Sequence, residues 1–344
     1  MNRPPRVAVV VACTRPGRIA AIAEVLGAEA DVACELVVAG DVADLPADGW
    51  AVPTTLVPVA ERHPNHRRRA ALEASTAPVV AFLDDDAVPA PGWLREAASL
   101  PDDATFVWTG PEVPTRTTPG AELAWSVASS LLAEGSRAHV ERDGRSVRWY
   151  EAPFCNLVTS RRLLERVGPP ALDIAWDTDD FDWCAAAAAG GATFHNRPAL
   201  GIAHDRYPDD LADWLARKAG ERRRTGEKLV RYPGLYLRVP GVVVGAAAPW
   251  VAVALVAAVG RGRRRGAVVA GLAAYGAAVA LETIRTGRRG LDAVAFAGGL
   301  AGLHVASAAG ISVGVVDGVA ARATGRPDDR AASGEGGGPW GARC

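Results

Sequence analysis

The sequence predicts an α/β domain built on a mainly parallel sheet, followed by membrane helices near the C-terminus. Continuous apolar runs recur through the first quarter of the chain, and several end in a polar or acidic side chain. Runs of this kind are typical of strands buried on both faces of a parallel sheet, whose polar ends line a ligand site. Beyond Val239 the composition changes to long stretches of Ala, Val, Leu and Gly, which favour bilayer spans.

Composition limits the classes of function. The chain has 344 residues, a formal net charge of -1 and 5 cysteines. The length predicts about two domains, and the near-neutral charge does not favour a nucleic acid partner. The cysteines show no paired spacing, which disfavours a zinc site or a disulfide framework. No secretory signal precedes the first apolar run, so we expect the catalytic part to face the cytoplasm.

The first elements alternate as expected for parallel β-α-β units. The apolar run at residues 6–13 predicts a buried strand, which the turn at 14–17 ends. The elements expected next are a helix at 18–28, strands at 35–40 and 54–59, a helix after the basic run 62–69 and a strand from residue 79. Asp41 and Asp84 end two of these strands, so we expect both at one edge of the sheet.

The middle of the chain predicts mixed α and β structure. The expected elements are a strand near 105–109, a helix at 120–133, a polar hairpin-like stretch at 142–145, a helix at 160–167, a helix over the alanine run 185–189 and a strand at 192–203 that ends at His204.

Three adjacent carboxylates, Asp84, Asp85 and Asp86, end the fourth apolar strand. Like charges at this spacing repel, so such a cluster usually persists where a divalent cation neutralises it. Carboxylate oxygens suit Mg²⁺ or Mn²⁺, ions that also bridge proteins to nucleotide phosphates. The alternative is a solvated turn whose aspartates cap the next helix. We expect an Mg²⁺ or Mn²⁺ site here.

A second group of acids precedes the alanine run, at Asp177, Asp179, Asp180 and Asp182. Acids at the start of a helix match its dipole. Capping explains one or two of the four, so the set favours a chemical role as well.

The C-terminal region predicts two to three transmembrane helices within residues 239–316, in the apolar stretches 239–260, 267–284 and 290–316. Three spans place one of the two Arg-rich loops outside the cell, against the positive-inside tendency, which makes the second stretch a candidate for a re-entrant or flat segment. The alternative is an Ala-rich soluble helical domain. We expect a multi-pass protein of the cell membrane.

Two further segments flank the predicted spans. Residues 206–238 form a basic amphipathic segment that includes Arg222, Arg223 and Arg224. It is suited to rest on anionic headgroups, and packing of a charged helix on the domain is the equal alternative. Residues 317–344, rich in Gly, Ser, Asp and Ala, are expected to be disordered.

Four motifs, in order, resemble the family 2 glycosyltransferases of the GT-A fold over residues 6–235. Thr14-Arg15-Pro16 is similar to a shortened form of the turn that follows the family's first strand. Asp41 lies where the family has a base-contacting acid, and Arg68 lies at its nucleotide-contacting arginine. Residues 80–93 resemble the metal-binding motif, and residues 179–182 resemble the acidic motif near the acceptor.

The resemblance implies roles for individual residues. Asp180 would be the catalytic base, with Asp179, Asp182 and Asn156 on the acceptor side. His204 lies where related enzymes have a further metal or phosphate ligand, with a satisfied core histidine as the alternative. The implied metal ligands are Asp84, Asp86 and His204, and the implied nucleotide-sugar contacts are Thr14, Arg15, Asp41, Arg68, Asp84 and Asp85. The sequence departs from the family pattern in lacking an Asn after Thr14 and in having Arg69 and Ala186 at positions of a motif Asn and Arg.

The resemblance implies an Mg²⁺- or Mn²⁺-dependent, inverting transfer of one hexose from a nucleoside diphosphate sugar. The chain lacks the Gln-x-x-Arg-Trp run of processive synthases between residues 205 and 240, which favours single addition. The predicted tether favours a lipid-linked glycan acceptor at the cytoplasmic face of the membrane, with a soluble acceptor as the alternative. The expected division is a catalytic domain at 1–205, with a donor half to about 110 and an acceptor half from 111, before the basic segment, the spans and the tail.

Two other functions fit parts of the pattern. Asp84 and Asp86 after an apolar strand are also similar to the nucleophile motif of haloacid-dehalogenase-like phosphatases, with Asp84 as the nucleophile. That family has the motif on its first strand, whereas here it follows the fourth. A catalytically inactive, membrane-anchored nucleotide-binding scaffold is the other alternative. It would be expected to lack the metal or base acids, and both sets are present.

Overall fold

The computed structural model describes residues 6–133, 146–172, 179–239, 242–243 and 265–324. The chain forms two compact units, described here separately. Unit 1 comprises Met1–Thr115 and His139–Arg206, and unit 2 comprises Arg116–Ala138 and Tyr207–Cys344. The predicted hairpin-like stretch at 142–145 lies outside the described residues.

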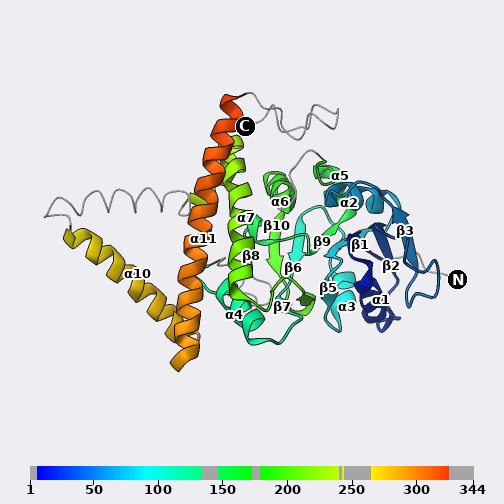
Figure 1. The fold of residues 1–344 in the computed structure, drawn as a ribbon. Helices are drawn as coiled ribbons and strands as arrows, with labels where there is room; N and C mark the ends of the chain where they lie inside the picture. Colours follow the sequence, from blue (N-terminus) through cyan, green and yellow to red (C-terminus); the bar gives the residue numbers. More distant parts are fainter. Residues whose placement is uncertain (1–5, 134–145, 173–178, 240–241, 244–264, 325–344) are drawn as a thin grey trace. The chain divides into compact units, whose positions relative to one another are not determined.

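Unit 1 is organised around a mostly parallel sheet of eight strands, in the order β3-β2-β1-β4-β9-β6-β10-β8 (Figure 1). The four strands at the β3 end run parallel, β10 runs parallel to β6, and β9 and β8 run antiparallel to their neighbours. The bounds are β1 Val7–Cys13, β2 Cys34–Gly40, β3 Thr54–Pro58, β4 Val79–Asp84, β6 Phe106–Thr109, β8 Ser146–Val147, β9 Asn156–Ser160 and β10 Thr193–Asn196.

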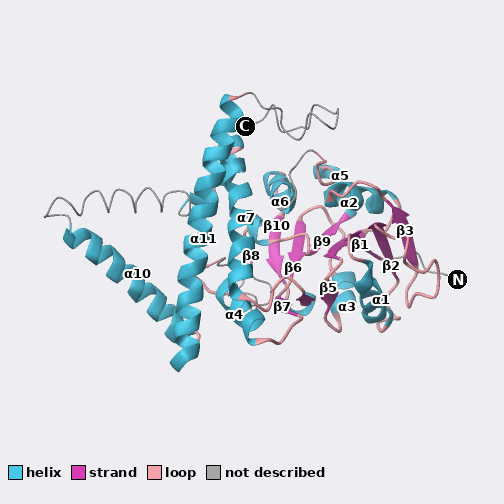
Figure 2. Cartoon of the chain, viewed as in Figure 1, coloured by secondary structure: helices cyan, strands magenta, loops and turns pink. Residues whose placement is uncertain are grey.

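Helices cover both faces of this sheet (Figure 2). Val9 and Val11 of β1 join a core with α1 and α3, whereas Val10 joins a core with α2, α5 and α6. This alternation explains why the β1 run is apolar throughout. The bounds are α1 Ile19–Gly27, α2 Pro64–Glu73, α3 Trp93–Ser99, α5 Arg161–Val167 and α6 Asp179–Ala189, with short 3-10 turns η1 Pro16–Arg18, η3 Trp149–Glu151 and η4 Pro198–Leu200.

A second sheet of three short strands differs from the sequence expectation. It has the order β5-β11-β7, formed by Ala87–Pro89, Ile202–His204 and Glu112–Pro114. The expected strand at 192–203 is in fact two strands in different sheets, because η4 interrupts it at Pro198, a residue that cannot donate to a ladder. The expected turn after Asp86 contains β5, and β9 was not expected at all.

Unit 2 is helical in its described part. Its helices are α4 Pro119–Ala128, α7 Leu211–Arg231, α8 Pro233–Tyr236, α10 Arg265–Arg285 and α11 Gly290–Ala323. The predicted basic segment forms α7, which packs along α11. Glycines permit that packing, because a Cβ at Gly226 or Gly314 would collide with the backbone oxygen of Ile311 or Arg223. Arg223 pairs with Asp317 across the two helices at 2.8 Å.

Within the described residues, one helix is long and apolar enough to cross a membrane, and it is α11. At 34 residues it is roughly 50 Å long. A core helix of a soluble protein can have the same length and composition, so α11 alone does not establish a span. The expectation of two to three spans is therefore supported for one stretch only. Most of the first stretch and residues 325–344 of the predicted tail lie outside the described residues.

Candidate functional site

Strand register brings the predicted acids to one edge of the main sheet. Strand β1 lies between β2 and β4, with Ala12 opposite Asp84 and Cys13 opposite Gly40. Because these strands are parallel, their carboxyl ends lie together, and the residues that follow each strand meet there. The turn after β1 therefore lies beside the acids after β4.

Asp85 holds that turn in place. Its Oδ2 accepts hydrogen bonds from the backbone N–H of Thr14 at 2.6 Å, from Thr14 Oγ1 at 2.8 Å and from the backbone N–H of Arg15 at 2.7 Å. The carboxylate is buried. A buried carboxylate requires such donors, so Asp85 organises the loop that presents Arg15. A direct nucleotide contact from Asp85 or Thr14 stays a prediction.

Asp86 lies between two cationic groups. Its Oδ2 is 2.5 Å from Arg15 Nη2, and its Oδ1 is 3.0 Å from His204 Nε2. Burial by itself raises the pKa of Asp86, but the hydrogen bond and charge of His204, with the charge of Arg15, outweigh burial and lower that pKa to about 2. The Asp86 carboxylate is thus held in its ionised form at the sheet edge.

Asp84, Asp86 and His204 form a donor set suited to a divalent cation. Their candidate ligand atoms all lie within 4.8 Å of one another. Two neighbouring ligands of an octahedral ion at about 2.1 Å are roughly 3 Å apart, which matches the 3.0 Å between Asp86 Oδ1 and His204 Nε2. Carboxylates with one imidazole suit Mn²⁺ and Mg²⁺. These residues therefore fit the expected metal.

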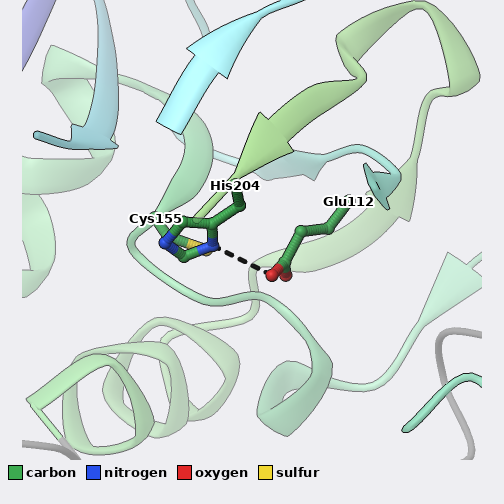
Figure 3. A group of neighbouring side chains, drawn as sticks. All are labelled: Glu112, Cys155 and His204. Atoms are coloured by element: carbon green, nitrogen blue, oxygen red, sulfur yellow. Dashed lines mark hydrogen bonds and ion pairs between the residues drawn. The ribbon is translucent and has the colours of Figure 1, made fainter. Parts of the chain in front are cut away.

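His204 also belongs to a second buried group of side chains, with Glu112 and Cys155 (Figure 3). Glu112 Oε1 lies 2.9 Å from His204 Nδ1. Burial by itself lowers the pKa of His204, but Cys155, Asp86 and Glu112 around the ring raise it well above its usual value. Burial raises the pKa of the Cys155 thiol. His204 is thus held at both ring nitrogens.

Two arginines of α2 connect the strand ends. Arg67 is fully buried and donates to the backbone oxygens of Cys13 and Glu61 and, at 3.2 Å, to Asp41 Oδ1. The Asp41 side chain is 57% exposed, so its carboxylate remains accessible at the sheet edge. Arg68 donates to Asp84 Oδ1 at 3.3 Å. Both predicted nucleotide-contacting positions, Asp41 and Arg68, therefore lie at the same edge as the metal-type ligands.

The second acidic group begins α6. Asp180 Oδ1 accepts a hydrogen bond from the backbone N–H of Phe181 at 2.8 Å. A series of contacts joins this helix to the sheet edge: the Arg68 guanidinium stacks 4.6 Å from the Phe154 ring centroid, and Phe154 lies 5.8 Å from Trp183 of the first turn of α6. Arg68, which pairs with Asp84, thereby links the two acidic groups. The base role of Asp180 and the acceptor-side role of Asp182 stay predictions.

Asn156 and Asp179 are the other two predicted acceptor-side residues, and the structure describes the side chain of Asn156 only. Asn156 is buried at the start of β9, where its Oδ1 accepts from Trp93 Nε1 at 3.2 Å and its Nδ2 donates to the Leu200 oxygen at 2.6 Å. These contacts hold β9 to its surroundings. The side chain of Asp179 lies outside the described ones. For both residues an acceptor role stays a prediction.

Sequence reasoning missed three residues that hold this edge together. Glu112 contacts His204, Arg67 joins β1 to Asp41, and Asp205 accepts from Arg18 Nη2 at 2.6 Å and from Thr115 Oγ1 at 3.2 Å. Arg67 lies in the basic run 62–69, and nothing in the sequence marks it there as a buried arginine. Glu112 lies between two prolines outside any motif, and nothing local marks it.

Comparisons with known proteins bear on the fold of the chain. No protein-family model matches the chain. The mannosyltransferase PcManGT from Pyrobaculum calidifontis, solved in complex with GDP-Man and Mn²⁺, matches with a TM-score of 0.53 and 22% identity over 89% of this chain and 87% of that chain. The fold is GT-A-like. The expected mixed α/β fold with a mostly parallel sheet is thereby confirmed.

Sequence relatives also carry a glycosyltransferase name. The pre-mycofactocin glycosyltransferases of Mycobacterium tuberculosis strains CDC 1551 / Oshkosh and ATCC 25618 / H37Rv are each 28% identical over 249 residues, or 71% of this chain and 51% of theirs. The chain thus spans about half the length of these curated relatives. In this GT-A-like fold the acids follow β4, in the middle of the sheet, so the phosphatase alternative lacks the strand position that it requires.

Proposed function

We propose that this protein is a metal-dependent, inverting glycosyltransferase that moves one hexose from a nucleoside diphosphate sugar to a lipid-linked acceptor. One observation carries the proposal. Asp84, Asp86 and His204 converge at the carboxyl edge of a GT-A-like sheet, and Arg15, Arg68 and Asp41 surround them. Cationic and metal-ligating groups at such an edge suit a sugar nucleotide. The structural neighbour PcManGT, solved with GDP-Man and Mn²⁺, supports that donor class.

Each residue at the sheet edge has a proposed part in holding the donor. Asp84, Asp86 and His204 would hold Mn²⁺ or Mg²⁺, which when bound offsets charge on the diphosphate. Arg15 is 61% exposed and bonded through one nitrogen, so its guanidinium can reach a phosphate oxygen from the β1 turn. The Asp41 carboxylate, which directly follows β2, would accept from the N–H groups of a nucleotide base.

Asp180 is the proposed base. It takes the proton of the acceptor hydroxyl while that oxygen forms a bond to the anomeric carbon. The bond from this carbon to the diphosphate oxygen breaks on the opposite face, and the nucleoside diphosphate leaves with the electron pair of that bond, so configuration inverts. The helix start favours negative charge at Asp180 through the α6 dipole. General base catalysis of this kind contributes about 10² to 10⁴ in rate.

Exposed apolar side chains in unit 2 support association with a membrane, where a lipid-linked acceptor at the cytoplasmic face is proposed. Large apolar residues on α10 and α11 are more than half exposed, which soluble monomers seldom show as extended faces. They include Val269, Leu272, Leu281, Ile284, Leu291, Val294, Val305 and Val316. A membrane would cover these side chains and hold the active site near lipid substrates.

The test uses the purified full-length chain in detergent. A panel of radiolabelled nucleotide sugars is incubated with Mn²⁺ and a total lipid extract, and both nucleoside diphosphate release and label in the organic phase are measured. We expect one donor to give both signals, excess EDTA to abolish them, and the product linkage to be inverted relative to the donor by NMR.

Three outcomes would contradict parts of the proposal. Full activity in EDTA removes the metal, and retained anomeric configuration removes the direct displacement at Asp180. Label confined to a water-soluble product removes the lipid acceptor. Absence of transfer with every donor, from protein that binds nucleotide sugars normally, favours the inactive scaffold instead.

A further inference from the structure

We infer that Glu112 is a positioning residue that fixes the tautomer and ring orientation of His204 for metal binding. This inference rests on the proposed metal-dependent function. Glu112 itself belongs to none of the predicted ligand or substrate positions.

The small sheet places Glu112 and His204 on one face. In the parallel pair of β7 and β11, Glu112 lies opposite Ile202, and Pro114 lies opposite His204. Side chains two residues apart on a strand point to the same face, so Glu112 and His204 are diagonal neighbours. On the other side of β11, His204 lies opposite Ala87 of β5, which directly follows Asp86. The pairing of β11 with β7 on one side and with β5 on the other therefore brings a carboxylate to each nitrogen of the His204 ring.

The hydrogen bond selects the tautomer. The 2.9 Å contact between Glu112 Oε1 and His204 Nδ1 requires a proton on Nδ1, because an ionised carboxylate only accepts. Nε2 faces Asp86 and Asp84, at 3.0 and 3.9 Å. A metal that displaced the Nε2 proton would leave the proton on Nδ1 and meet the lone pair of Nε2. Carboxylates behind metal-ligating histidines act in this way.

Burial indicates that the position of Glu112 is specified. Its side chain and that of His204 are each 6% exposed, and its Oε2 lies 3.5 Å from Arg206 Nη1. Glu112 is the buried residue of the three-residue strand β7, and a buried acid costs desolvation that an apolar residue would avoid. One carboxylate oxygen contacts His204 and the other contacts Arg206, so Arg206 fixes the orientation of the carboxylate that in turn orients His204.

A second metal site made of Glu112, Cys155 and His204 is the competing interpretation. Two ligands of a tetrahedral zinc ion, each about 2.0–2.1 Å from the metal, would be roughly 3.3 Å apart. The 2.9 Å between Glu112 and His204 is a hydrogen-bond distance and leaves less room than that. The geometry therefore favours a positioning role.

Mn²⁺ binding to the full-length protein in detergent tests the inference. Electron paramagnetic resonance gives the Mn²⁺ dissociation constant, and the ¹⁴N modulation of the bound ion reports a directly ligated imidazole. In Glu112→Ala we expect about 10- to 100-fold weaker binding and a weakened ¹⁴N signal. Glu112→Gln, which keeps size but lets either amide group face Nδ1, is expected to fall between this variant and wild type.

Glu29→Ala is the matched control. Glu29 is also a buried carboxylate of unit 1, and it accepts from the backbone N–H groups of Gly92 and Arg95 at 2.9 Å. We expect it to lower the melting temperature while wild-type Mn²⁺ affinity and ¹⁴N modulation are kept. That combination separates positioning of His204 from general loss of stability.

The outcomes distinguish the two proposals. If wild type binds Mn²⁺ with ¹⁴N modulation, and folded Glu112→Ala and Glu112→Gln keep the same dissociation constant and modulation, the inference alone is overturned. Wild type without such binding overturns the metal-dependent function and the inference with it. Cd²⁺ that produces thiolate absorption lost in Cys155→Ala assigns Glu112 to a second metal site and also overturns the inference.

Discussion

The two acidic groups of unit 1 are held in different ways. Asp84, Asp85 and Asp86 meet cations or N–H donors from the β1 turn, from α2 and from β11, all fixed by strand register. Asp180 and Asp182 lie in the first turn of α6, where the helix itself sets their place. Acids enclosed by cations suit a fixed ligand set, and acids at a helix start suit contact with a substrate.

Asp86→Ala is expected to have the largest effect. It removes the ligand that both Arg15 and His204 contact, so metal-dependent nucleotide binding should be lost and turnover should fall by about 10⁴-fold or more. Isothermal titration with nucleotide, with and without Mn²⁺, and steady-state kinetics measure both. Asp102→Ala, which removes a partly exposed ion pair with Arg6, is the control and should change neither. Metal-dependent binding retained in Asp86→Ala would exclude the ligand role.

Asp180→Asn should separate chemistry from binding. Asparagine keeps the size of the side chain but cannot take the acceptor proton, so turnover should fall by about 10² to 10⁴ while donor affinity stays near normal. The kinetic constants and a donor titration measure this. If the variant keeps wild-type turnover, the base is another residue, and Asp179→Asn and Asp182→Asn identify it.

Asp85→Asn should act on structure before chemistry. It weakens four charge-assisted hydrogen bonds that Thr14 and Arg15 donate to the carboxylate, so we expect a loss of about 1–3 kcal/mol in the free energy of unfolding and a turnover reduced by about tenfold. Thermal and chemical unfolding measure the first quantity. Wild-type stability in this variant would mean that the turn after β1 does not depend on the carboxylate.

Asp182→Asn should have the smallest effect. If α6 presents one working carboxylate, neutralising a neighbour changes turnover by less than about threefold, and removal of one charge from a helix start costs about 0.3–1 kcal/mol in stability. Kinetics and thermal unfolding of this variant, measured beside Asp180→Asn, check the difference. Equal losses in the two variants would show that the acids act as a set.

Sequence patterns could predict the parallel strands of the large sheet, because these strands form long apolar runs. β1, β2 and β4 are buried on both faces and therefore read as continuous apolar segments, and the polar residues after them were expected at one edge. His204 and Arg68 were placed with these acids through a family resemblance. The structure brings all of them together at that edge.

The short sheet could not be predicted, although it sets the position of His204. β5 and β7 have three residues each and contain proline, so local propensity favours turns. Their order around β11 depends on contacts between residues 87, 112 and 204, which no local period encodes. For the same reason Glu112 escaped notice: its partner is 92 positions away.

The path of the chain at this small sheet has a mechanical consequence. The chain passes from unit 1 to unit 2 after Thr115, one residue beyond β7, and again after Arg206, two residues beyond β11. The backbone N–H of Thr115 also donates to the His204 oxygen at 3.3 Å, which clamps the two exits to each other. The units are joined at three places, and two of these junctions follow the strands that carry Glu112 and His204. A pulling force on unit 2 would therefore reach both strands directly, and with them the imidazole that they hold.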